Sequence, residues 1–176
     1  GEPDIPSVNK YACTGSSFIS SEYFKSNKDS YRVFRITRNE TPNTKNETIG
    51  FKQTIEKELQ NPQMVVVSYK IRASKSISGV NVSLGYTDGA EIDGSDTINI
   101  SADWEYRLSS IIVEFPKQYT RSLLIDLTSH LSEGDWCEIS DLNIVLLSDI
   151  ANFPKSTKSR IGKIKGIIDP IFGSIE

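Results

Sequence analysis

The chain has 176 residues, which is enough for one domain with a buried core. Its net charge is −3 at pH 7 and its pI is about 5.3, so no overall positive field favours binding to nucleic acid or to acidic lipids. No apolar run is long enough to cross a bilayer, so no transmembrane segment is expected. A hydrophobic share of only 37% suits an all-β domain in which each sheet has one wet face.

The first part of the chain predicts a linker followed by the start of a β domain. Residues 1–10 contain two prolines and are interpreted as a linker, and the domain is expected to occupy residues 11–148. The run 31–37 alternates between apolar and polar side chains, which predicts a strand with Phe34 and Ile36 in the core.

The region 49–86 contains three apolar, β-rich runs separated by turn-forming residues. These runs cover residues 49–56, 64–73 and 80–86, and the pattern is typical of successive antiparallel strands. In the second and third runs, apolar side chains alternate with polar ones. The polar set is expected to share one sheet face; it comprises Lys70, Arg72, Asn81 and Ser83.

Further short strands are predicted downstream, and no helical pattern separates them. Residues 87–96 are rich in Gly and Asp and predict a turn region. Strands are then expected at 97–101, 104–115, 121–129 and 136–147. This succession favours an all-β fold of two antiparallel sheets over a parallel α/β sheet.

The C-terminal segment has a different composition. Residues 149–176 combine clustered Lys and Arg with isoleucines near helical spacing. This predicts a tail, helical in part, that serves as an oligomerisation or docking segment. A basic patch for a membrane surface is the alternative.

The sequence contains no recognisable catalytic constellation. His130 is the only histidine, and no nucleophile is paired with it by any motif. No pair of carboxylates is marked out for glycoside hydrolysis, and no phosphate-binding loop is present. The chain is therefore interpreted as a non-enzyme.

Metal and disulfide sites have only weak signals. No cofactor is expected, and two Cys with one His cannot complete a closed tetrahedral zinc site without carboxylate ligands. Calcium is a secondary hypothesis for the acidic cluster in the region 87–96, which contains Asp88, Glu91, Asp93 and Asp96. Cys13 and Cys137 form either one disulfide or two buried thiols.

Taken together, the strand runs resemble the jelly-roll carbohydrate-binding modules. The resemblance rests on the runs 49–55, 65–73, 80–84, 104–106 and 137–146, and it covers about residues 31–147. The chain lacks the opening motif that helps to hold a structural calcium in many such modules, although Asp141 matches the acidic position of the last strand. Modules of this kind occur on polysaccharide-degrading enzymes and on phage tails and baseplates. The resemblance implies a jelly-roll β-sandwich, a glycan ligand, and an extracellular or virion-surface location.

The candidate sugar-binding residues are aromatic rings and side chains that hydrogen-bond to hydroxyl groups. A ring covers the apolar C–H face of a sugar, while Arg, Lys, Asn and Asp bind its hydroxyls. Trp136 is expected to be exposed, because it points opposite to Cys137 and Ile139, whereas Trp104 is expected in the core. The predicted carbohydrate-binding set is Trp136, Tyr86, Tyr119, Arg72, Lys70, Asn81 and Asp126.

Two main hypotheses about function remain open, beside a third in which the domain is an enzyme accessory with no ligand of its own. In the first, the domain is a non-catalytic module that attaches a larger protein or assembly, such as a phage tail or baseplate, to a cell-surface or cell-wall glycan. In the second, it is a structural domain whose polar face is inert and whose C-terminal tail docks on a neighbouring subunit.

Overall fold

A computed structural model describes residues 12–25, 32–55, 63–87, 89, 91–113 and 120–147. The predicted linker and C-terminal tail, including its predicted helical part, lie outside these residues, as does Tyr119. The described residues form ten β-strands and no helix, so the predicted all-β class is confirmed.

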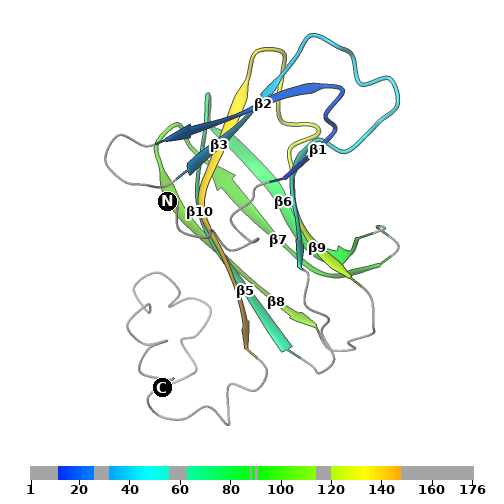
Figure 1. Ribbon diagram of the computed structural model, residues 1–176, viewed down its shortest axis with the longest axis vertical. Coiled ribbons are helices and arrows are strands. Elements are labelled where there is room, and N and C mark those ends of the chain that lie inside the picture. Colours follow the sequence, from blue (N-terminus) through cyan, green and yellow to red (C-terminus); the bar gives the residue numbers. More distant parts are fainter. Residues whose placement is uncertain are drawn as a thin grey trace, which may run out of the picture.

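The strands form two antiparallel sheets of five strands each (Figure 1). One sheet, here named the β9 sheet, has the order β1 (Cys13–Thr14), β4 (Gly50–Ile55), β9 (Arg121–Asp126), β6 (Ile77–Tyr86) and β7 (Ile92–Ile100). The other, the β10 sheet, has the order β2 (Ile19–Lys25), β3 (Arg32–Arg38), β10 (Trp136–Leu147), β5 (Gln63–Ala73) and β8 (Glu105–Val113).

The core lies between the two sheets and follows the alternation of the sequence. In β5, Val67, Tyr69 and Ile71 are fully buried, whereas the residues between them face outward. Phe34 and Ile36 on β3 are buried too, so the predicted core pair is confirmed.

Two features of the strand prediction were wrong. The chain crosses from one sheet to the other after β4 and again after β5, so the runs 49–56, 64–73 and 80–86 are not neighbours. Instead, β9 lies between β4 and β6. The predicted turn region at 87–96 also contains the first half of β7, because Gly94 and Ser95 pair with Leu84 and Ser83 of β6 along the sheet edge.

The described part of the chain contains no helix that is long and apolar enough to span a membrane.

The two cysteines are free thiols and lie on different sheets, Cys13 on β1 and Cys137 on β10. The alternative of two thiols is therefore the one that the structure supports. Cys137 is fully buried and Cys13 is partly buried, and burial raises the pKa of both thiols.

We expect the native protein to resist thiol reagents at neutral pH. Cys13 should react slowly and faster as the pH rises, because only the thiolate attacks and the raised pKa keeps it scarce. Cys137 should react only after unfolding. A coloured disulfide reagent measures this, and the Cys13→Ser variant should leave no reactive thiol in the native state. If unfolded wild-type protein does not react with the reagent in the absence of reductant, the two cysteines form a disulfide instead.

Candidate functional site

The predicted sugar-binding residues fall on opposite faces of the sandwich. Lys70 and Arg72 lie on the outer face of the β10 sheet, whereas Asn81 and Asp126 form a pair across β6 and β9. The two pairs cannot contact the same ligand site, because the outer faces of the two sheets point in opposite directions. The prediction that these polar residues share one platform was wrong.

Asp126 and Tyr86 of the predicted set lie on strands of the β9 sheet and have other contacts there, away from Lys70 and Arg72. Asp126 accepts hydrogen bonds from the backbone N–H and the hydroxyl of Thr128, at 3.0 and 2.6 Å, and so stabilises the turn after β9. Tyr86 stands at the end of β6, with the guanidinium of Arg121 5.3 Å from its ring centre. Tyr119 lies outside the described residues.

The outer face of the β10 sheet carries a row of charged side chains centred on Glu138. Glu138 lies in β10, directly opposite Arg35 of β3 on one side and Arg72 of β5 on the other. The Nε atoms of Arg35 and Arg72 each lie 2.8 Å from a carboxylate oxygen of Glu138, and Nη2 of Arg35 forms a second contact. Glu138 is only 2% exposed, so one acidic group is covered by two cations.

Both tryptophans stand against these arginines. The guanidinium of Arg35 lies 4.2 Å from the ring centre of Trp136, and that of Arg72 lies 4.7 Å from Trp104 and 5.6 Å from Trp136. We name this set the Glu138 row; it comprises Arg35, Arg72, Trp104, Trp136 and Glu138.

Trp104 is only partly buried and faces outward, so its predicted place in the core was wrong. The sequence did contain a signal for this. Ile111 and Val113 are core residues, and counting back along β8 from them assigns Tyr106 and Trp104 to the outer face.

A second group lies beside the Glu138 row on the same face. Nζ of Lys70 is 4.9 Å from the ring centre of Tyr106 and 3.4 Å from a carboxylate oxygen of Asp141. Tyr106 is 50% exposed, which makes it the most accessible ring on this face among the described residues. Sequence reasoning missed Tyr106 because its face can be assigned only by counting back from the core residues Ile111 and Val113 at the far end of β8.

This face presents hydrogen-bond donors to solvent. The side chains of Arg35, Arg72 and Lys70 are 26%, 34% and 34% exposed, whereas their acidic partners Glu138 and Asp141 are 2% and 14% exposed. Arg72 uses its Nε for Glu138, and its two terminal nitrogens donate to no residue that the structure describes. The surface can therefore bind oxygen atoms beside an exposed ring.

The acidic cluster suggested for calcium is described only in part, and two of its members pair with other side chains. Asp93 binds Arg121, and Asp96 accepts a hydrogen bond from Ser109 at 3.0 Å. Asp88 lies outside the described residues. No group of three or more His, Cys, Asp or Glu among the described residues is arranged to hold a metal ion.

Comparisons with known proteins agree on the architecture. No protein-family model matches the chain, and no curated protein matches it by sequence. By structure, the chain is similar to a CBM4 carbohydrate-binding module, with a TM-score of 0.52 and 15% identity over 82% of this chain and 91% of that one. The chain has the jelly-roll fold of carbohydrate-binding modules.

Two further likenesses extend this result. The CBM22-1 xylan-binding domain of Xyn10C from Paenibacillus barcinonensis gives a TM-score of 0.54 at 9% identity, covering 79% of this chain and 86% of that domain. The enzymatically active domain of tailspike protein 4 from bacteriophage CBA120 gives 0.50 at 12% identity. The match covers 78% of this chain but only 19% of the tailspike chain. At these identities the likenesses establish the fold and do not identify a ligand.

Proposed function

We propose that the protein is a non-catalytic carbohydrate-binding module that binds a glycan on the outer face of the β10 sheet. The observation that carries this proposal is the Glu138 row beside Tyr106: exposed cationic donors next to a half-exposed ring, on an open sheet face. The jelly-roll fold that it shares with carbohydrate-binding modules supports the proposal.

Each residue has a role that follows from its geometry. Tyr106 supplies the apolar surface on which the C–H face of a sugar stacks. Lys70 lies opposite Tyr106, and Arg72 lies further along β5 on the same face. Both donate charge-assisted hydrogen bonds to hydroxyl oxygens of the bound sugar. Trp104 and Trp136 serve mainly to hold the guanidinium groups in place, because the arginines stand against their rings.

The same contacts argue against catalysis at this face. Hydrolysis of a glycosidic bond needs a carboxylic acid that can give a proton to the leaving oxygen. Both oxygens of Glu138 accept hydrogen bonds from arginines and the residue is buried, so a glycosidic oxygen cannot reach this carboxyl group. Glu138 positions the donors rather than reacting.

The proposed setting is outside the cell, where the domain attaches a larger protein to a cell-surface or cell-wall glycan. A virion surface is included in this proposal, since a domain of a phage tailspike has a similar fold. Binding of the labelled domain to intact bacterial cells, competed by the isolated wall polysaccharide, would test this setting. A lack of cell binding by a domain that binds soluble glycans would count against it.

We expect Tyr106→Ala to weaken glycan binding at least tenfold, because the ring is half exposed and buries its apolar face only when a sugar covers it. Affinity electrophoresis against a panel of soluble polysaccharides, including xylan, β-glucan, galactan and peptidoglycan fragments, measures this. Arg72→Ala should weaken binding by a similar factor.

Tyr23→Ala is the matched control, since Tyr23 is 49% exposed on β2 and packs on Phe34 instead of flanking Lys70. Thermal unfolding of all three variants shows whether each is folded. The proposal is contradicted if wild-type protein binds none of the panel, or if a bound glycan is retained equally by Tyr106→Ala and Arg72→Ala.

A further inference from the structure

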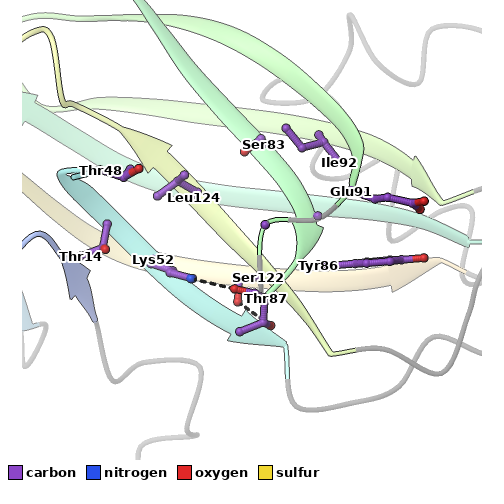
Figure 2. A pocket seen from close by; sticks show the side chains of 12 residues that line it. Thr14, Thr48, Lys52, Ser83, Tyr86, Thr87, Glu91, Ile92, Ser122 and Leu124 are labelled. Carbon is purple, nitrogen blue, oxygen red and sulfur yellow. Dashed lines mark hydrogen bonds between the residues drawn. The ribbon is translucent and has the colours of Figure 1, made fainter. Parts of the chain in front are cut away.

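The opposite face of the sandwich contains a separate hollow. It lies on the outer face of the β9 sheet and has a volume of about 340 Å³ (Figure 2). Its walls come from β1, β4, β6, β7 and β9 and from the segments next to them. A volume of this size matches the lower end of small-molecule sites. None of the residues of the Glu138 row contributes to it.

The hollow is lined by hydroxyl groups, and some of these lack a partner. Ser122 shares a hydrogen bond with Thr87 at 3.0 Å. Ser83 is 6% exposed, and its hydroxyl makes no hydrogen bond to any residue that the structure describes. The hydroxyls of Thr14 and Thr48 are likewise without a partner in the described chain. The Ser83 hydroxyl lines the hollow and can donate a hydrogen bond to a ligand atom or accept one from it.

One cation reaches into this hollow. Nζ of Lys52 donates to the backbone carbonyl of Thr87 at 3.0 Å, and its other two N–H groups have no partner among the described residues. Figure 2 shows the side chains of Tyr86 and Glu91 pointing away from Lys52 and Leu124. Glu91 also lines the hollow, so its walls carry one ammonium group and one carboxylate, and Figure 2 shows the two apart. Leu124 provides an apolar patch on the Lys52 side.

We infer that this hollow is a second binding site, separate from the glycan face, for a sugar unit that carries a carboxylate, such as a hexuronic acid residue. The carboxylate binds the free N–H groups of Lys52, and the ring hydroxyls pair with Ser83 and the threonine hydroxyls. The C–H face of the sugar covers Leu124. A glycan with acidic units would then bind both faces, which raises its overall avidity.

Titration of the isotope-labelled protein with glucuronate and with galacturonate tests the inference, with glucose as the neutral control. Backbone amide shifts should appear on β4, β6 and β9 with at least one uronate and be far weaker with glucose. Lys52→Met should weaken uronate binding about tenfold, the effect of losing one charge-assisted bond. Ser83→Ala should weaken it severalfold, and Lys75→Met, which removes an exposed lysine that pairs with Asp135, should not.

The Tyr106→Ala and Arg72→Ala variants separate this inference from the proposed function, because they should keep the uronate shifts on the β9 sheet. The inference is overturned if neither uronate produces shifts there at millimolar concentration, if glucose binds equally well, or if folded Lys52→Met protein binds as wild type. Uronate shifts confined to the β10 sheet would overturn it as well, while supporting the glycan face.

Discussion

Replacing Asp93 by alanine is expected to lower the free energy of unfolding by about 3–5 kcal/mol. Arg121 is 1% exposed, although it carries a charge, and its Nε lies 2.8 Å from a carboxylate oxygen of Asp93. A second contact at 3.4 Å joins Nη2 to the other oxygen. A guanidinium group does not lose its proton in a protein, so Asp93→Ala removes two carboxylate contacts from a buried positive charge.

Urea unfolding followed by fluorescence measures the effect, with Ser95→Ala as the control. Ser95 is an exposed residue on the same strand, β7, and its replacement should change stability by less than about 0.5 kcal/mol. The double variant Asp93→Leu with Arg121→Met should recover much of the loss, because it removes both charges together. A loss below about 1 kcal/mol in Asp93→Ala would mean that the ion pair is not buried in solution.

Replacing Gly50 by alanine is expected to cost about 3 kcal/mol, at the upper end for overpacked sites. Gly50 is buried at the start of β4, opposite Asp126 of β9. A Cβ atom there would lie 2.0 Å from the carbonyl oxygen of Ile125, much closer than atoms approach. That oxygen belongs to the central strand of its sheet, so relief requires β4 to move away from β9.

Gly79→Ala is the matched control for this substitution. Gly79 has a φ of +73°, and a Cβ atom there would meet nothing within 4 Å. The cost should then be only the backbone strain of about 1–2 kcal/mol. Chemical denaturation of both variants gives the comparison. Equal losses in the two would contradict a steric origin for the effect at Gly50.

Much of the fold could be predicted from local alternation, as β5 shows. Its inward residues Val67, Tyr69 and Ile71 were assigned correctly because every second side chain is apolar. The partition of strands between sheets could not be predicted in this way. The alternation in β5 and β6 looks alike. No local sequence pattern indicates that the chain crosses from one sheet to the other between Ala73 and Ile77.

The candidate site was predictable only in part for the same reason. Arg72, Lys70 and Trp136 were chosen correctly as outward-facing residues of what became the β10 sheet. Arg35 and Glu138 were not selected, because in the sequence each is one charged residue among many. Only the pairing of β10 with β3 and β5 shows that Glu138 lies between two arginines. A carboxylate that is 2% exposed on an outward face is a property of the assembled sheet rather than of any one strand.

The position of Glu138 between two arginines has a consequence for the thermodynamics of ligand capture. A free arginine loses up to about 2 kcal/mol of rotamer entropy when it is fixed. Here folding has already fixed Arg35 and Arg72, since each is tied to Glu138 and stands against a tryptophan ring. Ligand binding therefore costs little further side-chain entropy at these two arginines. More of the free energy of each hydrogen bond then contributes to affinity.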